Sequence, residues 1–558
     1  MKSLIGFLLL YTFISKAQTP TVGLIQNDAG TYDGYTLFTP LACPANNCGT
    51  YLLNNCGEIV HQWPTTASAG LSSVLLPDGK LLRPYAIPHP FINAGGVGGG
   101  IQLFDFDGNL LWDYILTDSI QTQHHDVVAM PNGNILALVW AYKDSTECVN
   151  RGRNPAHLTS GGIWSDKLIE IRPIFPDSGE IVWEWDSWDH LVQEFDGSKP
   201  QYAPPSNHPE LYDINYYGWS LDGADWLHTN AIDYNPALDQ IAMSSRYFHE
   251  VYILDHSTST AQAAGHTGGN SGKGGDIIYR WGNAEAYGKD LYVNRKLFAQ
   301  HNVHWIKDGL TDAGKLMIFN NGTERTPVEY SSVDIIDPNP DVNGNYTLDV
   351  NGRYGPDSAE WSYVAPNPTD FHSQYIAGAE RLPNGNTIIC DGTHGTIFEI
   401  DVAKNVVWKY VSPVTYGGIL SQGSSVPPFA IHGTSNWVFR APKYGANYSA
   451  FNGHTLTGYG YVEQNPDPTI CPAVSIAEIN KSASVSVFPN PTDSKISIKT
   501  TEQVKVNSIG LQNVFGQVLP IQFEPKEKDL IEVDLSTLPA GIYFLQVSDQ
   551  QVRIIKTN

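Results

Sequence analysis

The sequence lacks several features that would identify common classes of protein. After Ile14, no stretch contains the ~18 consecutive apolar residues that a helix needs to cross a bilayer. Lysine and arginine total 33 against 57 aspartates and glutamates, which gives a formal net charge of −24. Such an acidic surface repels nucleic-acid phosphates and anionic lipids. We therefore expect neither a transmembrane segment nor a nucleic-acid partner.

Cysteine is also scarce. The 558-residue chain has six cysteines, and no two of them have the CxxC spacing of a redox site or a zinc ribbon. Cys43, Cys48 and Cys56 lie close together and are able to form one short local bridge. We interpret the cysteines as structural.

The N-terminus has the layout of a secretory signal peptide. Lys2 precedes an apolar stretch from Leu4 to Ile14, which is followed by small and polar residues up to Gln18. We predict a signal peptide over residues 1–18 and a mature protein outside the cytoplasm, where disulfides form.

Internal repetition is the most informative property of the chain. A short apolar strand with an aromatic residue occurs six times, at residues 58–63 (EIVHQW), 109–112 (NLLW), 180–183 (EIVW), 276–281 (DIIYRW), 360–364 (EWSYV) and 405–408 (NVVW). Tight-turn signals precede three of these strands, at residues 76–80 (LPDGK), 130–134 (MPNGN) and 382–386 (LPNGN). An inner hairpin followed by an outer aromatic strand is the pattern of a propeller blade.

The two ends of the repeat region complete each other. The motif at Trp63 has no inner hairpin before it, and the strand-like pieces after Asn436 have no outer motif after them. Joining both in one blade closes the ring and leaves no exposed sheet edge. We predict an all-β protein, with a six-bladed β-propeller over residues 19–475.

Three histidines occupy the same position in consecutive repeats. His124, His228 and His301 each come just before the strand that we assign innermost, whereas other repeats have Gly70 and Ile376 there. Blade symmetry therefore predicts that the three imidazoles converge. They are candidates for catalysis or for zinc binding. Their neighbours His125 and His304 are expected to point elsewhere, because side chains alternate along a strand.

The segment 225–230 (DWLHTN), followed by Ser244-Ser-Arg246, resembles a signature of the aryl-sulfate sulfotransferases, a family of six-bladed propellers. The similarity extends over most of residues 60–460. It includes Gln300-His301, the turn at 382–386 and residues 439–444 (FRAPKY).

This resemblance implies a ping-pong transfer of a sulfuryl group from an aryl sulfate to a phenolic acceptor, without a nucleotide sulfate and without a cofactor or metal. It assigns His301 as the nucleophile that becomes a sulfohistidine, and His124, His228 and Arg246 as residues that hold the sulfuryl group and assist proton transfer. Asn230 is expected to orient His228 or to bind the sulfate. The chain departs from well-known periplasmic members of the family: residues 284–300 contain no cysteine, so the small disulfide loop before the nucleophile is missing.

The last part of the chain resembles the C-terminal sorting domain of type IX secretion cargo in Bacteroidetes. Its motifs occur in order at residues 486–492 (SVFPNPT), 533–543 (VDLSTLPAGIY) and 554–556 (IIK). We assign residues 476–558 to a small β-sandwich sorting domain, which implies the type IX machinery as a partner and a secreted or cell-surface location. A carbohydrate-binding β-sandwich is the alternative.

Two other functions fit the propeller. One is a non-catalytic protein that binds an anionic ligand, and the missing disulfide loop favours it. The other is a metal-dependent hydrolase or lyase that uses the converging histidines.

Overall fold

A computed structural model describes residues 20–44, 48–92, 94–158, 160–216, 218, 223–429, 433–467, 469–471, 486–499, 509–513, 517–527, 530–547 and 550–557. The chain divides into two compact units, Met1–Cys471 and Pro472–Asn558. The predicted signal peptide, residues 1–18, and the predicted domain boundary after residue 475 lie outside the described residues.

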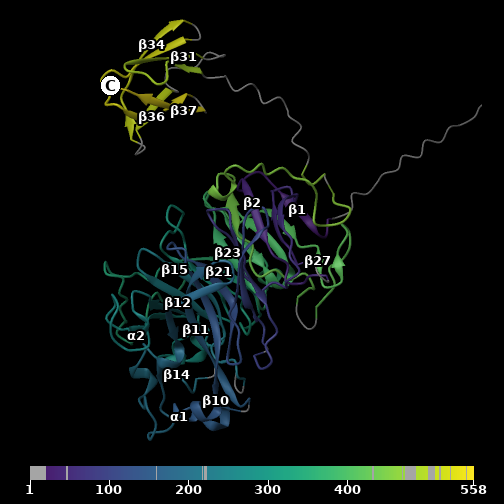
Figure 1. Ribbon diagram of the computed structural model, residues 1–558, viewed down its shortest axis with the longest axis vertical. Coiled ribbons are helices and arrows are strands. Elements are labelled where there is room, and N and C mark those ends of the chain that lie inside the picture. The colour runs from purple at the N-terminus through teal and green to yellow at the C-terminus, as the bar shows by residue number, and fades with distance from the viewer. Residues whose placement is uncertain are drawn as a thin grey trace, which may run out of the picture. The chain divides into compact units, whose positions relative to one another are not determined.

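The first unit consists almost wholly of antiparallel strands (Figure 1). Six sheets of four or five strands occur in its described part. The first three have the strand orders β29-β2-β3-β4 (Lys443–Gly445, Gly34–Phe38, Thr50–Leu53, Ile59–Trp63), β5-β6-β7-β8 (Val74–Leu75, Leu81–Ala86, Gly99–Phe104, Leu110–Ile115) and β9-β10-β11-β12 (Gln121–Ala129, Ile135–Asp144, Gly162–Ile174, Ser178–Asp186). The other three have the orders β15-β16-β17-β18 (Thr229–Asn235, Gln240–Ser245, Glu250–Asp255, Ile277–Trp281), β19-β20-β21-β22 (His301–Trp305, Leu316–Asn320, Ser332–Ile336, Trp361–Tyr363) and β23-β24-β25-β26-β1 (Ala377–Arg381, Thr387–Asp391, Thr396–Ile400, Val406–Val411, Gly23–Asn27).

Smaller elements fill the connections. Two-stranded pairs are β13 with β14 (Leu191–Val192, Tyr212–Asp213) and β27 with β28 (Val414–Thr415, Gly418–Ile419). The described α-helices are α1 (Ser145–Asn150) and α2 (Thr260–Ala263), and the short 3-10 turns include η2 (Ser187–Asp189).

The predicted tight turns are confirmed. They connect β5 to β6, β9 to β10 and β23 to β24, which are the first two strands of their sheets. Gly79, Gly133 and Gly385 occupy the turns with φ of +87°, +86° and +87°, a left-handed conformation that glycine adopts without steric cost.

The repeated aromatic residues lie in the outer strands and connect neighbouring sheets. Five of the tryptophans donate an indole N–H hydrogen bond to the next sheet or its loops: Trp63 to Asp105 O (2.9 Å), Trp112 to Ser178 O (2.7 Å), Trp183 to Thr258 Oγ1 (3.2 Å), Trp281 to Pro356 O (2.6 Å) and Trp408 to Asn55 O (2.8 Å). A hydrophobic cluster also joins each sheet to the next, and another joins the sheet of β26 to that of β2. The architecture is a β-propeller, and the count of six blades stays a prediction.

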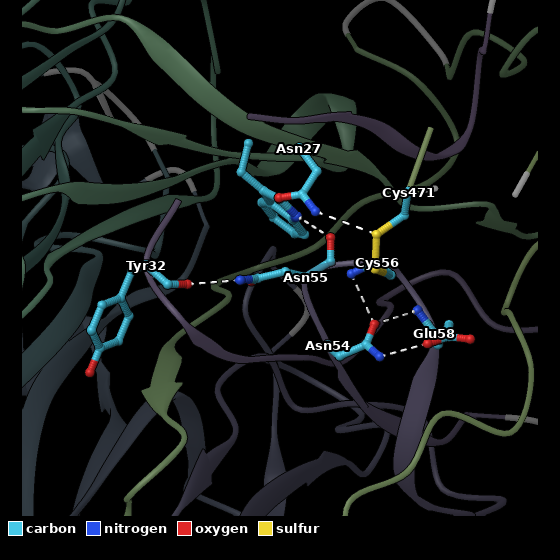
Figure 2. The surroundings of a disulfide bond; sticks show 8 residues. Asn27, Tyr32, Asn54, Asn55, Cys56, Glu58 and Cys471 are labelled. Carbon is cyan, nitrogen blue, oxygen red and sulfur yellow. Dashed lines mark hydrogen bonds between the residues drawn. A yellow bond between two sulfur atoms is a disulfide. The ribbon is translucent and has the colours of Figure 1, made fainter. Parts of the chain in front are cut away.

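The first and last parts of the propeller region meet in one sheet, as predicted. Tyr444 in β29 pairs with Tyr35 in β2. The local bridge is also confirmed, because Cys43 is bonded to Cys48. A second disulfide, between Cys56 and Cys471, fastens the end of the unit to the loop between β3 and β4 (Figure 2).

The second unit contains two four-stranded sheets in its described part. They are β30-β31-β35-β34 (Ser486–Phe488, Lys495–Lys499, Leu530–Asp534, Gln522–Glu527) and β33-β32-β36-β37 (Val518–Leu519, Ile509–Asn513, Gly541–Val547, Gln550–Lys556). Residues such as Ile498 and Val533 from the first sheet pack with Leu511 and Leu545 from the second. The unit is therefore a small β-sandwich with its own core.

Candidate functional site

The first strands of successive sheets lie against one another: β9 contacts β15, β15 contacts β19, and β19 contacts β23. His124 and His125 lie within β9, His228 directly precedes β15, and His301 begins β19. His125, His228 and Asn302 there have left-handed φ angles of +49°, +50° and +53°, and the strand pairing shifts register beside them. Left-handed backbone at residues other than glycine costs free energy and is concentrated at functional sites. The irregular backbone therefore coincides with the predicted site.

His301 is buried at the start of β19, and its hydrogen bonds define its tautomer. Its Nδ1 lies 2.8 Å from Asn321 Oδ1. The amide nitrogen of Asn321 donates to the carbonyl oxygens of Ser373, at 2.7 Å, and of Tyr375, so the amide oxygen must face His301. His301 Nδ1 is then the protonated nitrogen, and Nε2 carries the lone pair. Burial and then the positive charge of Arg246 hold the pKa of His301 well below its usual value.

Arg246 follows β16 beside His228. Its backbone N–H donates to the carbonyl oxygen of His228 at 3.1 Å. Its buried guanidinium lies 5.5 Å from the ring centre of Tyr247 and 5.4 Å from that of Tyr375. The aromatic rings flank a buried positive charge that lies close enough to His301 to lower its pKa.

His228 forms a pair with a carboxylate. Its Nδ1 lies 2.5 Å from Asp225 Oδ2, and both side chains are buried. Because the carboxylate accepts the Nδ1 proton, Nε2 is the nitrogen that can exchange a proton with a ligand. The ring of His228 lies 4.7 Å from the ring of Tyr247.

The expectation that His125 points elsewhere is wrong. The ring of His125 lies 4.8 Å from that of His228, whereas the fully buried ring of His124 stacks on Trp140 at 3.9 Å. His124 Nδ1 lies 2.8 Å from His125 Nδ1, and His124 Nε2 lies 3.4 Å from Asp166. The left-handed backbone at His125 breaks the alternation of the strand, so the structure brings His125 beside His228 and places His124 behind it.

Asn230, two residues after His228, contacts the chain segment that leads into His301. Its amide nitrogen donates to the carbonyl oxygen of Gln300 at 2.8 Å, directly before His301. The Gln300 amide donates in turn to the carbonyl oxygens of Ser245 and Glu250, both at 2.8 Å. Asn230 thus contacts the backbone that carries His301.

Arg440 is a further charged residue beside these histidines. The sequence assigned it no role, although it lies within the FRAPKY motif. Its guanidinium donates to Asp126 Oδ2 at 2.8 Å and to the Asn230 carbonyl oxygen at 3.4 Å. Its charge also lowers the pKa of His125, after burial and the neighbouring histidines. Sequence reasoning also missed Asn321, Tyr247 and Tyr375, and only the adjacency of Tyr247 to Arg246 offered a signal.

The segment before His301, which has no disulfide loop, is anchored by aromatic and basic side chains. The guanidinium of Arg295 lies 3.8 Å from the Tyr292 ring centre. The Tyr292 hydroxyl lies 3.0 Å from His249 Nε2, and His249 Nδ1 accepts the backbone N–H of Ala299 at 2.9 Å. Ala299 is two residues before His301, so these contacts set the path of the chain into the site.

Two features lie apart from these residues. A cavity of about 860 Å³ is lined by side chains of the β22 to β26 region, such as Tyr363 and Phe398, and none of the predicted site residues lines it. Within the described residues, one group of three histidine and acidic side chains has its ligand atoms within 4.8 Å of one another, namely His190, His266 and Asp276.

A family model described as arylsulfotransferase matches residues 91–412, more than half of the chain. The chain belongs to the arylsulfotransferase family. A second model, described as a secretion system C-terminal sorting domain, matches residues 486–557. The protein is therefore an arylsulfotransferase-family propeller that is secreted or displayed at the cell surface. No helix in the described ranges is long and apolar enough to span a membrane.

Individual relatives of this arylsulfotransferase-family chain are distant. A search of curated proteins gives no match. A solved protein of unknown function from Bacteroides caccae is 12% identical and covers 74% of this chain and 98% of its own, with a TM-score of 0.37. A streptogramin B lyase is 10% identical and covers 77% and 100%, with a TM-score of 0.32. A putative 6-phosphogluconolactonase from Bacteroides fragilis is 9% identical and covers 75% and 99%, with a TM-score of 0.35. Similarity at this level indicates no substrate.

Proposed function

We propose that the protein transfers a sulfuryl group from an aryl sulfate to a phenolic acceptor, through a sulfohistidine at His301 and without a nucleotide sulfate. The observation that carries this proposal is the contact of His301 Nδ1 with Asn321 Oδ1 at 2.8 Å, which leaves the Nε2 lone pair free. A neutral imidazole is a competent nucleophile. Burial and the charge of Arg246 lower the pKa of His301, which favours this neutral form.

In the first half-reaction, Nε2 of His301 attacks the sulfur atom of the aryl sulfate. The N–S bond forms as the bond between sulfur and the aryl oxygen breaks, and the aryl oxide leaves. His228, protonated on Nε2 and held by Asp225, donates the proton that converts the aryl oxide to a phenol.

The second half-reaction reverses these bonds with a new partner. Nε2 of His228 takes the proton of the acceptor hydroxyl, whose oxygen attacks sulfur and breaks the N–S bond. His301 and protonated His228 are then restored. The same imidazole acts as acid and as base, and Asp225 stabilises its charged form.

Arg246 is the residue best suited to the charge of the sulfuryl oxygens. Its guanidinium remains charged and offers a planar set of donors. Because it is held between Tyr247 and Tyr375, its orientation is fixed before the substrate arrives. His125 lies in β9 and faces His228, where it is placed to assist the proton transfer. His124 contacts His125, and Asp166 lies next to His124. Asn230 positions His301 through Gln300.

The test is an assay with nitrophenyl sulfate as donor and a phenol as acceptor, with no nucleotide present. The wild-type chain should produce sulfated acceptor, and His301→Asn should abolish its formation. His304→Asn, which changes a histidine in the same strand, is the matched control and should retain turnover. Turnover by His301→Asn would reject the assigned nucleophile. Saturable binding of the sulfate without any turnover would favour the non-catalytic binding protein.

A further inference from the structure

A second cluster of polar side chains lies outside the predicted sulfuryl site. His190 comes between η2 and β13, whereas His266 and Asp276 lie at the two ends of a glycine-rich loop between α2 and β18. His190 Nδ1 and His266 Nδ1 lie 2.8 Å and 2.7 Å from the same carboxylate oxygen, Asp276 Oδ1. Three potential ligand atoms from two separate parts of the propeller therefore converge on one point.

The outer contact of His190 determines which nitrogen faces this point. His190 Nε2 lies 2.8 Å from the carbonyl oxygen of Ala263, which can only accept a hydrogen bond. Nε2 is therefore protonated, and in the neutral ring Nδ1 carries the lone pair. A lone pair and a carboxylate oxygen 2.8 Å apart repel each other, so either a second proton on the ring or a metal ion must lie between His190 Nδ1 and Asp276 Oδ1. Metal-binding histidines typically donate their second ring N–H to a carbonyl in this way.

The surroundings fix the His190 side chain and leave the His266 side of the cluster open to solvent. His190 is fully buried and stacks on Trp185, with ring centres 5.6 Å apart and planes at 7°. A Cβ at Gly275 would lie 2.0 Å from Ala263 O and 2.7 Å from His190 Nε2, so only glycine fits there. His266, by contrast, has 53% of its side chain exposed. An ion can therefore enter from the side of His266.

Backbone hydrogen bonds close the loop that carries His266 and Asp276. The N–H of Gly274 donates to Gly268 O at 2.9 Å, and the N–H of Gly275 donates to Gly265 O at 3.0 Å. The N–H of Ser271 donates to Asp255 Oδ2 at 2.7 Å. The two ends of the loop are thus fixed relative to each other, which reduces the entropic cost of binding an ion between them.

We propose that His190, His266 and Asp276 bind a zinc ion, with water completing a tetrahedral site. Two imidazoles and a carboxylate are a ligand set that zinc accepts at distances of ~2.0–2.2 Å. The ion ties the segment after β12 to the loop before β18, and so stabilises the contact between two neighbouring sheets. The site contains none of the residues of the sulfuryl site, and its function does not depend on the proposed reaction.

The test uses the full chain after removal of metals with a chelator. Zn²⁺ is titrated against a competing indicator, and Co²⁺ is titrated by its visible absorption. We expect one Zn²⁺ to bind per chain, and His266→Ala and Asp276→Asn to weaken binding by about 100-fold or more, because each removes one of three ligands. Zinc should raise the melting temperature of the wild type and leave that of His266→Ala unchanged.

His208→Ala is the matched control, because this histidine also pairs with a carboxylate, that of Glu210 at 2.9 Å, but belongs to no group with metal spacing among the described residues. It should bind zinc as the wild type does. Three results would each overturn the proposal: no stoichiometric zinc in the wild type, unchanged affinity in His266→Ala, or loss of the bound zinc in His301→Asn, which would locate the ion at the other histidines.

Discussion

The Nδ1 atom of His301 and the amide oxygen of Asn321 lie 2.8 Å apart, and this contact determines which nitrogen of His301 can react. Two backbone carbonyls hold the amide of Asn321 in that orientation. Replacing Asn321 by leucine should lower kcat about 100-fold, because the imidazole loses its fixed tautomer and position.

Asn321→Asp tests whether Asn321 acts on the His301 imidazole or only supports the fold. A carboxylate beside Nδ1 favours the imidazolium form, so it should raise the pKa of His301 and move the acid limb of the rate profile to higher pH. Asn320→Ala, which removes hydrogen bonds to Lys296 and Phe298 in the same region, should lower stability without moving that limb. An unchanged acid limb in Asn321→Asp would contradict the assignment.

Loss of the Asp225 carboxylate should slow the reaction most with sulfate donors whose leaving group must be protonated. In Asp225→Asn the amide can donate to His228 Nδ1 and select the opposite tautomer, so we expect kcat to fall about 100-fold or more with phenyl sulfate. Nitrophenyl sulfate should be less affected, because nitrophenolate leaves without protonation. Asp239→Asn alters a similar pair, with His256 at 2.7 Å, and should leave both rates unchanged. Equal losses with the two donors would count against proton transfer by His228.

The partly buried His304 should make the fold less stable in acid. Burial lowers the pKa of His304 from 6.5 to about 4. As pH falls through 6.5, the unfolded chain takes up a proton at this residue and the folded chain does not, so its contribution to the free energy of unfolding declines between pH 6.5 and about 4. In urea unfolding at several pH values, His304→Asn should lose less stability than the wild type over this range. Parallel curves for the two proteins would show that His304 does not titrate in this way.

The two disulfides should differ in their effect on stability. Cys56 and Cys471 close a loop of 415 residues, whereas Cys43 and Cys48 are five residues apart. By the loop-entropy model, replacing the long-range pair with serines should lower the free energy of unfolding of the propeller by ~6 kcal/mol, and replacing the short pair by ~2 kcal/mol. Urea unfolding of the two double variants gives this comparison. A larger loss for the short pair would contradict it.

Much of the propeller could be predicted from the sequence, because its signals are local. Glycines such as Gly133 and Gly385 adopt left-handed angles in the turns that join inner strands, and each outer tryptophan has the same place in its repeat. The meeting of β2 with β29 followed from the two incomplete repeats. The six-blade count is one part of that prediction that still awaits a test.

The site was harder to predict because its side chains depend on irregular backbone and on distant segments. The left-handed residue at His125 reversed the expected direction of two histidines, and strand alternation contains no signal for such a bulge. Asn321 directly follows β20 and Tyr375 lies in a loop, so no spacing along the chain connects them to His301 or Arg246. Asp225 stands in the DWLHTN signature, but its pairing with His228 emerged only in three dimensions.

The most direct test of the central claim is mass spectrometry of the full chain after exposure to an aryl sulfate without an acceptor. We expect a peptide that contains His301 with one added sulfuryl group, and the loss of this group when a phenol is supplied. The same peptide from Asn321→Leu should carry less of the adduct. A sulfuryl group on His125, His228 or another residue, with His301 unmodified while the enzyme turns over, would contradict the account.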